Sequence, residues 1–428
     1  MRRVTLYSCL LVVGTLLVPP GSLQAQGTNA EVSALLTEVS LDSLIRYVSE
    51  LSGEIPVHVA DSTLLIYLDS LGSVDSVWVS DTLVSLPNRF HGANEAAAAF
   101  LEQKLRSFGY DSISAVIYPA LPVTRNVVAY KAGTDPLGPL WVLCAHYDSV
   151  LRAPGADDNA SGTAVVLEAA RLLSNIQTNA SIMFGFWDSE EAGLFGSDQF
   201  AAYAHDWVLP IDGVLNLDMV GWDGDGDRVL QIHADDPAAW IAGYMKRVAG
   251  DYSLGVNPYL AIPGTGRSDH MSFRKYGYPA VKIIEDEGDD FNPFYHTEAD
   301  VIDHFDLEYF HEVAKLAVAT VAELALSGTA VAAEFETPVD DDFVLDPVYP
   351  NPARDFVEFR HRAKRPDDVR FTITDVLGRT VAVLGDDAGK PGMQVIRWTI
   401  PTDLPAGLYF VTLQSQAMTT TRAFVIAR

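Results

Sequence analysis

The sequence predicts a layered α/β domain followed by a small all-β sandwich. In the middle of the chain, short apolar runs typical of buried strands alternate with segments of helical period. The last part, 344–428, instead shows short segments in which apolar and polar residues alternate, separated by Gly, Pro and Asp turns. We therefore expect a mixed, mostly parallel sheet flanked by helices, and then a sandwich of β-sheets.

The chain begins with the three parts of a secretory signal peptide. Arg2 and Arg3 are followed by an apolar run over Leu10–Val18 and by a small-residue cleavage site at Leu23–Ala25. We expect residues 1–25 to be removed and the mature protein to be secreted, either extracellular or at the cell surface. The apolar run is too short to span a bilayer comfortably, so no transmembrane anchor is expected.

Length and charge limit the classes of function. A chain of 428 residues with 48% hydrophobic content can bury a large core and form two or three folding units. Its net charge of -28 becomes about -30 when Arg2 and Arg3 are subtracted, which argues against nucleic acid or an anionic membrane as partner. Without the signal peptide only Cys144 remains, so the exported chain has no intramolecular disulfide, which favours a large enzyme over a small disulfide-rich module.

The first predicted elements surround a segment of uncertain role. Glu31–Leu51 carries apolar residues at helical spacing, whereas Asp61–Val84 is rich in Val, Leu and Ser. Residues 26–85 are therefore an N-terminal extension or an insertion: a cap over the site, a removable pro-segment or part of the fold. A clearer helix follows, because Asn94 is a favourable cap, good helix formers come next and Gly109 ends the run.

The rest of the expected catalytic domain, 26–330, contains the buried strands and a closing helix. Phe310–Leu326 has the period of an amphipathic helix, which ends before Gly328. The predicted strands are Leu140–Ala145, Ser181–Trp187, Val214–Leu217 and Ala280–Ile284.

A linker over 331–343 separates this domain from the sandwich over 344–428. Thr337–Asp342 is acidic and contains a proline, as linkers between domains often do. Beyond it, Val369–Ile373 and Leu408–Leu413 alternate as half-buried strands do, and no cluster of acid, His and Cys residues appears.

Acidic and His residues follow the predicted strands of the first domain. His146 and Asp148 come at the end of one strand, where alternation directs both side chains to the same side and a carboxylate can orient a metal-binding imidazole. Asp157 and Asp158 stand in a tight turn before a helix over Thr163–Leu173. Carboxyl ends of parallel strands are where open α/β sheets bind their ligands, so these groups are candidates for one site.

Four further candidates complete the pattern. Glu190 and Glu191 are adjacent, so their side chains cannot point the same way, which suits one as a metal ligand and the other facing a bound water. Asp218 ends an apolar strand, where an unpartnered carboxylate is costly, and His296 precedes another acidic stretch.

Together, in their order and approximate spacing, these motifs resemble the co-catalytic zinc aminopeptidases of peptidase family M28. The resemblance covers roughly 31–328 and is strongest over 140–300. The motifs that carry it are His146-x-Asp148, Gly155-x-x-Asp158-Asn159-x-Ser161-Gly162, Glu190-Glu191, Asn216-x-Asp218-Met219, Ser268-Asp269-His270 and Tyr295-His296-Thr297.

The resemblance implies the zinc exopeptidase fold and two zinc ions per chain. It makes His146 and Asp218 ligands of one zinc, Glu191 and His296 ligands of the other, and Asp158 a bridge between them. The implied activity is that of an aminopeptidase, which hydrolyses N-terminal residues from peptides with a free N-terminus by means of zinc-bound water.

The same resemblance assigns supporting roles. Glu190 is implied as the general base, Asp148 as the partner that orients His146, and Tyr295 as a hydrogen-bond donor to the oxyanion. Asp300 is expected to support His296 in a similar way, and His270 to lie beside the substrate pocket, away from the metals. A cis peptide bond after Asp158 is also implied.

The terminal domain contains four short motifs: Tyr349-Pro350-Asn351-Pro352, Asp375-Val376-Leu377-Gly378-Arg379, Ala406-Gly407-Leu408-Tyr409 and Phe424-Val425-Ile426-Ala427-Arg428. With these motifs it resembles the C-terminal sorting domain of type IX secretion cargo. The resemblance implies the secretion machinery as a partner, and either removal of the domain or attachment at the surface. A carbohydrate-binding or adhesion sandwich is the alternative.

Other activities stay open at this point. A glutaminyl cyclase-type acyltransferase would use the scaffold with a single zinc, a carboxypeptidase or dipeptidase would use the same fold, and a surface protein could keep the fold without catalysis. Asp223–Asp227 has acids at alternate positions but lacks the glycine turn and distal Glu of a calcium loop, so we interpret it as a solvated turn.

Overall fold

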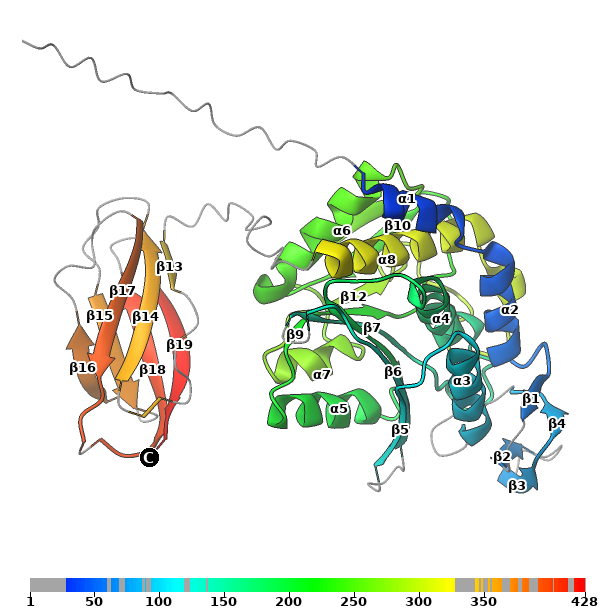
Figure 1. Ribbon diagram of the computed structural model, residues 1–428, viewed down its shortest axis with the longest axis horizontal. Coiled ribbons are helices and arrows are strands. Elements are labelled where there is room, and N and C mark those ends of the chain that lie inside the picture. Colours follow the sequence, from blue (N-terminus) through cyan, green and yellow to red (C-terminus); the bar gives the residue numbers. More distant parts are fainter. Residues whose placement is uncertain are drawn as a thin grey trace, which may run out of the picture. The chain divides into compact units, whose positions relative to one another are not determined.

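The structure is a computed structural model in which the chain forms two compact units, Met1–Phe335 and Glu336–Arg428 (Figure 1). The signal peptide expected over 1–25 lies outside the described residues. The described residues are 28–59, 63–68, 74–86, 89, 94–118, 124–135, 138–327, 343–345, 348, 353–354, 356–363, 370–375, 379–384, 392–402, 404–414 and 419–427.

An eight-stranded mixed sheet forms the centre of the first unit, in the order β11-β10-β12-β9-β7-β8-β6-β5. Strands β7, β8, β9 and β12 run parallel to their neighbours within this group, so their carboxyl ends lie at one edge of the sheet. β7 and β8 are buried at every position, which explains why they appear in the sequence as continuous apolar runs. The strands are β5 Ile113–Tyr118, β6 Thr124–Lys131, β7 Leu140–His146, β8 Ser181–Trp187, β9 Ile211–Leu217, β10 Val229–His233, β11 Asn257–Ala261 and β12 Ala280–Ile284.

Helices cover both faces of this sheet (Figure 1). One face carries α3, α4, α6 and α8, and the other carries α5 and α7. The fold predicted from the sequence, a mixed sheet flanked by helices, is confirmed. The helices are α3 Glu95–Ser107, α4 Gly162–Leu173, α5 Phe195–Asp206, α6 Ala239–Asp251, α7 His270–Lys275 and α8 Leu307–Ser327.

Two predicted element starts differ from the structure for physical reasons. α8 begins at Leu307, ahead of the predicted Phe310, because the Asp306 carboxylate accepts hydrogen bonds from the backbone amide of Tyr309 at 2.9 Å and from that of Glu308 at 3.0 Å. β9 begins ahead of the predicted Val214 and includes Gly213, where a Cβ atom would lie 2.6 Å from the Trp141 ring. A glycine inside a strand weakens the sequence signal but is required by this contact.

Asn94 precedes α3 as predicted, but its side chain does not cap the helix. The amide nitrogen instead donates to Asp188 Oδ1 at 2.6 Å, across the carboxyl end of β8. The capping role expected for Asn94 is therefore wrong, because a buried carboxylate distant in sequence takes the side chain.

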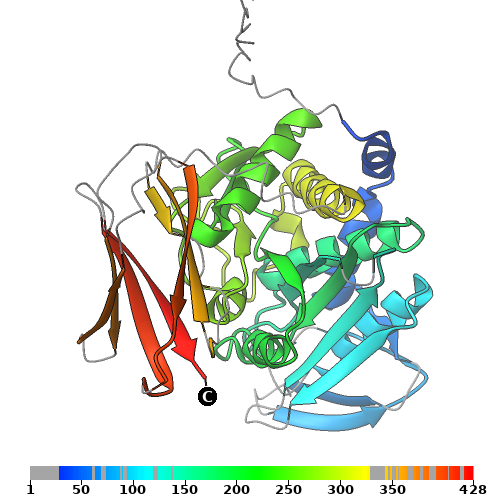
Figure 2. The same ribbon diagram turned by 60° about the vertical axis from the view of Figure 1, so that its left-hand side comes forward.

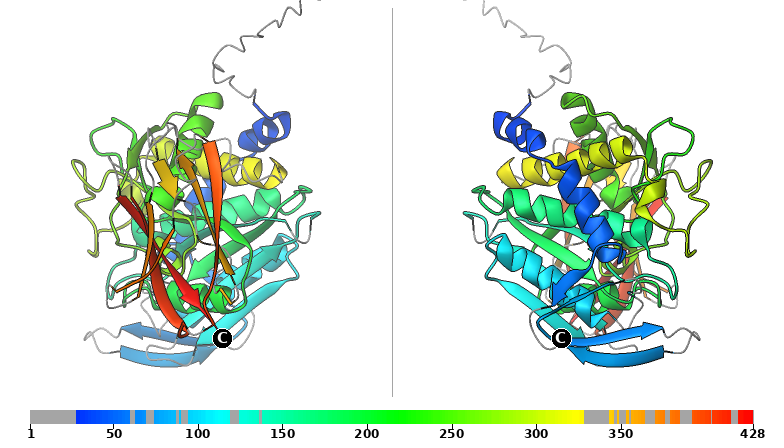
Figure 3. Two further views of the ribbon diagram at one scale, coloured as in Figure 1. Left: turned by 90° about the vertical axis from the view of Figure 1, so that its left-hand side faces the viewer. Right: turned by 90° about the vertical axis from the view of Figure 1, so that its right-hand side faces the viewer.

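The N-terminal segment forms two helices, α1 Ala30–Thr37 and α2 Leu41–Leu51, where the sequence suggested one helical run. Ser40 starts the second helix, because its hydroxyl accepts a hydrogen bond from the backbone amide of Ser43. Both helices lie on the outer side of α4 and α8 (Figure 3). Val32 and Leu44 are fully buried in the main core, which argues against a removable pro-segment.

Four short strands follow in pairs. β1 Val57–Val59 pairs with β4 Thr82–Val84, and β2 Thr63–Leu68 pairs with β3 Val74–Val79. No helix among the described residues is long and apolar enough to cross a membrane.

The second unit is an all-β sandwich (Figure 2). One sheet has the order β13-β14-β17 and the other β16-β15-β18-β19, all antiparallel. Phe359 of the first sheet packs on Phe371 and Phe424 of the second, with ring centroids 6.0 and 5.8 Å apart. The strands are β13 Phe343–Leu345, β14 Phe356–Ala363, β15 Arg370–Asp375, β16 Thr380–Leu384, β17 Gly392–Thr399, β18 Gly407–Gln414 and β19 Thr419–Ile426.

Candidate metal centre

The candidate donors gather at the carboxyl edge of the parallel strands. His146 is the last residue of β7, Glu190 and Glu191 follow β8, and Asp218 follows β9. Asp158 lies in the irregular turn Ala156–Ser161 before α4, and His296 lies in the loop after β12. The parallel topology therefore brings together side chains that are up to 150 positions apart in the sequence (296 − 146 = 150).

The donor atoms form two groups that share Asp158. His146 Nε2 lies 3.3 Å from Asp158 Oδ1 and 3.4 Å from Asp218 Oδ1. His296 Nε2 lies 3.0 Å from Asp158 Oδ2 and 3.1 Å from Glu191 Oε2. Each carboxylate oxygen of Asp158 thus faces a different histidine.

These separations suit zinc coordination. Two donors bound to one tetrahedral zinc at about 2.0–2.2 Å lie about 3.3–3.6 Å apart. The separations of 3.0–3.4 Å are close to this spacing, and imidazole with carboxylate is a donor set that zinc accepts. Glu191 Oε1 is buried and lacks a hydrogen-bond partner among the described residues, which leaves it free to bind a cation. The residues present therefore fit two metal ions.

The electrostatics of the cluster also favour cations. Burial, together with the charge of Asp158, raises the pKa of Glu191 to about 8. Burial alone would raise the pKa of Asp158, but hydrogen bonds from His146 and His296 hold it well below its usual range. The pKa of His296 rises to about 10, because Asp158 and Glu191 outweigh the effect of burial. Crowded carboxylates thus hold protons on the histidines, and two dications would take the place of that positive charge.

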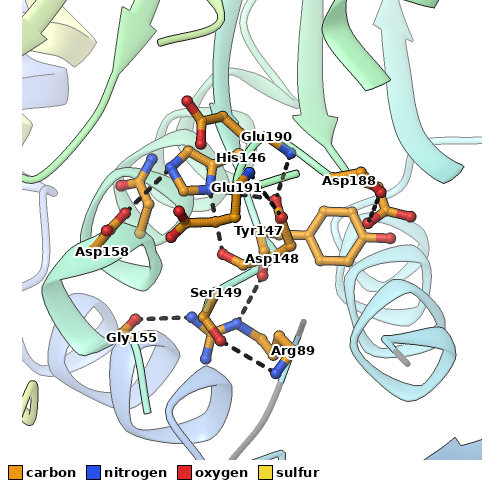
Figure 4. Close-up of polar contacts among 12 residues, drawn as sticks. Arg89, His146, Tyr147, Asp148, Ser149, Gly155, Asp158, Asp188, Glu190 and Glu191 are labelled. Atoms are coloured by element: carbon orange, nitrogen blue, oxygen red, sulfur yellow. Dashed lines mark hydrogen bonds and ion pairs between the residues drawn. The ribbon is translucent and has the colours of Figure 1, made fainter. Parts of the chain in front are cut away.

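Asp148 holds several parts of the centre in place (Figure 4). Its Oδ1 lies 3.4 Å from His146 Nδ1, the ring nitrogen that points away from the shared carboxylate. The same carboxylate accepts the backbone amides of Glu190 and Glu191 at 3.1 and 3.2 Å. One buried side chain therefore orients a donor histidine and fixes the segment that carries the next two acids.

The backbone around Asp158 is fixed from the other side by Asp300. Its carboxylate accepts the amides of Asp157 at 2.8 Å and Asp158 at 3.2 Å, whereas the sequence suggested a role beside His296. The peptide bond between Asp158 and Asn159 is cis, as the resemblance implied.

Tyr295 and His270 differ in their relation to the cluster. The Tyr295 ring stacks on the His296 ring with centroids 3.7 Å apart. Burial and the neighbouring carboxylates raise the pKa of its hydroxyl, which therefore stays protonated and can donate. His270 Nε2 instead lies 3.0 Å from the carbonyl oxygen of Thr265, and His270 belongs to neither donor group.

The structure separates Asp157 from the donors, although the sequence placed it beside Asp158, and adds one buried group, Arg89, that sequence reasoning missed. Asp157 accepts the amide of Gly221 at 2.9 Å and the side chain of Asn292 at 2.7 Å, so its carboxylate organises loops and does not join the donors. Arg89 is buried beneath the loop that follows β7 (Figure 4). A single Arg in a short connecting segment gave no sequence signal for such a position.

A third acidic group lies in exposed loops. Asp223, Asp225 and Asp290 bring carboxylate oxygens close together. Asp290 Oδ2 accepts the amide of Asp225 at 3.1 Å, and Asp223 Oδ1 accepts the amide of Arg228 at 3.1 Å. These backbone contacts agree with the interpretation of Asp223–Asp227 as a turn.

Comparisons with known proteins bear on both units. Residues 126–321 match the sequence profile of peptidase family M28, and residues 347–427 match that of the secretion system C-terminal sorting domain. The probable leucine aminopeptidase 1 of Trichophyton verrucosum (strain HKI 0517) is 31% identical over an alignment of 276 residues, and the match covers 57% of this chain and 71% of that protein.

Solved structures show the same fold. The LapA aminopeptidase of Legionella pneumophila has a TM-score of 0.57 at 24% identity, and the match covers 73% of this chain and 82% of that one. The glutaminyl cyclase of Porphyromonas gingivalis has a TM-score of 0.50 at 21% identity, over 67% of this chain and 98% of that one. At these identities the likeness concerns the fold alone.

Proposed function

This chain belongs to peptidase family M28 and is an aminopeptidase, and we propose that it works with two zinc ions and with Glu190 as general base. The observation that carries the proposal is the division of the Asp158 carboxylate between His146 and His296. A carboxylate shared in this way is what a pair of neighbouring cations requires. The C-terminal sorting domain implies export from the cell or display at its surface, and a signal peptide over 1–25 is part of the proposal.

We assign one zinc to His146 and Asp218, and the other to Glu191 and His296, with Asp158 bound to both. When bound, the ions would act as Lewis acids that polarise the scissile carbonyl and lower the pKa of bound water. Asp148 keeps the His146 ring in the orientation that presents Nε2 to the site.

Glu190 moves the proton in the proposed reaction. Its carboxylate lies within 4.8 Å of the donor atoms of His146 and Asp218, and its backbone is fixed by Asp148. Burial raises the pKa of Glu190 well above its usual value, and the charges of Asp269 and Asp218 add to the shift. A carboxylate of raised basicity accepts a proton from the attacking water and returns it to the leaving amine. Tyr295 donates a hydrogen bond from its hydroxyl to the carbonyl oxygen as negative charge develops there.

The excess of carboxylates explains the choice of an N-terminal residue. Asp158, Glu190, Glu191 and Asp218 gather in the two donor groups, beside which we place the first residue of a peptide. An α-ammonium group is attracted to such a site, whereas an internal peptide bond brings no charge to it. We therefore assign peptides with a free N-terminus as substrates.

The Glu190→Gln variant tests the assignment of the base. It should bind as much zinc as the wild-type chain, because the amide leaves the five donors in place, while kcat on aminoacyl anilides falls by about 10² to 10⁴. Glu298→Gln, an exposed neighbour of His296, is the matched control and should keep wild-type turnover. Full activity of the Glu190→Gln variant would refute the proposed base.

A substrate panel tests the reaction class. Acetylation of the N-terminus should abolish cleavage, and indifference to that block would exclude an aminopeptidase. About one zinc per chain together with cyclisation of N-terminal Gln would support a glutaminyl cyclase, and cleavage prevented by amidation of the C-terminus would support a carboxypeptidase.

A further inference from the structure

Arg89 is a buried arginine whose side chain contacts backbone carbonyl groups. It is 1% exposed, and its Nε donates to the carbonyl of Tyr147 at 2.7 Å. Nη1 donates to the carbonyls of Pro154, at 2.7 Å, and Leu51, and Nη2 to that of Gly155 at 2.8 Å. Burial of a guanidinium costs free energy unless its donors are hydrogen-bonded, so these bonds are what allow Arg89 to be buried here.

Three of the four carbonyls bonded to Arg89, those of Tyr147, Pro154 and Gly155, lie at the two ends of one loop (Figure 4). Tyr147 directly follows the donor His146, and Gly155 comes three positions before the donor Asp158. The Arg89 backbone joins the same loop, because its carbonyl accepts the amide of Ser149 at 3.2 Å. One side chain thus connects the two ends of the segment 147–155, which joins two of the assigned zinc ligands.

Gly155 shows that the loop is shaped around the guanidinium. Its φ of +64° is left-handed, and a Cβ atom there would lie 2.9 Å from Arg89 Nη2 and 2.4 Å from the carbonyl oxygen of Asp158. Only glycine allows the backbone to approach both groups this closely.

Arg89 also connects this loop to the N-terminal helices. Leu51 is the last residue of α2, and the final carbonyls of a helix have no partner within it. The negative end of the helix favours a cation, and Nη1 of Arg89 donates to the Leu51 carbonyl. The position of α2 is therefore linked to the loop between His146 and Asp158.

The guanidinium stays charged at neutral pH. Burial lowers its pKa to about 10, and the carboxylates of Asp300, Asp148, Asp158 and Glu191 oppose a larger decrease. Its charge thus faces the acidic centre through the loop, without direct contact with the assigned ligands among its hydrogen bonds.

We propose that Arg89 is a positioning residue for the metal centre, which fixes the 147–155 loop so that His146 and Asp158 lie at the spacing required to bind one zinc ion. The inference rests on the proposed function, because it takes both residues as zinc ligands. Arg89 touches neither the donor atoms nor the place assigned to the substrate. Its effect is therefore expected on metal affinity and kcat, with little effect on KM.

The test compares Arg89→Met, Arg89→Lys and Arg125→Met with the wild-type chain. Arg125 is the matched control, because its side chain pairs with Glu95 and Glu102 of α3 and lies outside the 147–155 loop. Zinc affinity is measured by competition with a chromophoric chelator, folding by far-UV circular dichroism, and kcat and KM on an aminoacyl anilide.

We expect Arg89→Met to lower zinc affinity about 10- to 100-fold, the usual effect of losing an outer-shell support, and to lower kcat with KM within about twofold. Arg89→Lys should recover part of the loss, because an ammonium group offers three donors but cannot span four carbonyls. Arg125→Met should keep wild-type zinc affinity.

Two outcomes would overturn the inference: wild-type zinc affinity in Arg89→Met, or an equal loss in Arg125→Met. If Arg89→Met does not fold, Arg89→Lys decides, and wild-type affinity in that folded variant overturns the inference. Failure of the proposed function is distinguishable from failure of this inference, because it would appear in the wild-type chain itself as binding of fewer than two zinc ions.

Discussion

The two halves of the candidate metal centre use the same kinds of donor atom but differ in the exposure of their histidines. The side chains of His146 and Asp218 are 1% and 13% exposed, and both stand at the ends of parallel strands in the core of the sheet. The side chain of His296 is 35% exposed and lies in a loop with a left-handed φ of 58°. Strands buried on both faces hold donors rigidly, whereas loops at the surface admit a substrate.

The difference in exposure explains how one site can combine tight binding of zinc with access for a peptide. The half around His146 is supported by Asp148 and, as we propose, by Arg89 beneath the loop. The half around His296 has a stacked Tyr295 as its neighbour and is open to solvent. We expect the first half to keep its zinc longer and the second to face the peptide.

The largest effect is expected from Asp158→Asn, because both halves of the centre lose their shared donor and the difference between them should disappear. An amide has no charge and cannot bridge two cations, so zinc content should fall below two per chain and kcat by about 10³ or more. Metal analysis and aminoacyl anilide kinetics check this. Asp303→Asn, an exposed acid, should leave both unchanged, and two tightly held zinc ions in the Asp158 variant would contradict the bridging role.

Single histidine variants compare how tightly each half of the centre holds zinc. His296→Ala should keep about one zinc per chain, because the buried half retains its donors, whereas His146→Ala should bind zinc more weakly, since it removes the most rigid donor. Dialysis against a graded series of chelator concentrations measures both. The ranking of the halves is wrong if His296→Ala loses all zinc while His146→Ala retains one ion.

The pH dependence of stability distinguishes the effect of bound protons from the effect of bound zinc. In the metal-free chain the pKa of His296 is about 10, above its ordinary value near 6.5, because its ion pairs with Asp158 and Glu191 outweigh burial. The pair with Asp158 therefore contributes its full stability below pH 6.5, and this stability is lost as the pH rises toward 10. Zinc needs the neutral imidazole, so its affinity should rise about tenfold per pH unit for each proton released.

Thermal unfolding at pH 6.5 and pH 9, with chelator or with zinc, checks this linkage. The chelated chain should melt at a lower temperature at pH 9 than at pH 6.5, and zinc should stabilise the chain more at pH 9. His296→Ala should reduce both differences. Equal stabilisation by zinc at the two values would contradict the proton release.

The smallest effect is expected from Tyr295→Phe, which concerns only the open half. Loss of one donor to the oxyanion should lower kcat about tenfold or more and leave zinc content at the wild-type level. The control is Tyr259→Phe, because this tyrosine is exposed and lies in β11 at the edge of the sheet. Wild-type kcat in the Tyr295 variant would show that the ring only packs against His296.

The sequence alone predicted the architecture, and it named candidate donors that the structure brings close together. β7 and β8 are buried on both faces, so they appear in the sequence as unbroken apolar runs, and the donors follow directly at their carboxyl ends. His146, Glu191 and Asp218 each belong to a short motif next to such a strand. Local patterns of this kind do not depend on the rest of the chain, and their order also carried the resemblance to the family.

Only the tertiary structure showed how the donors are supported. Arg89 bonds to carbonyls of residues 38 to 66 positions away, and Asn94 reaches Asp188 instead of capping its own helix. Every residue has a backbone carbonyl, so an arginine that binds such groups leaves no distinctive partner in the sequence. The burial of α1 and α2 was equally hidden, because it depends on α4 and α8, which come later in the chain. Short-range periodicity determines the strands and helices, whereas contacts between distant segments are decided by packing in three dimensions.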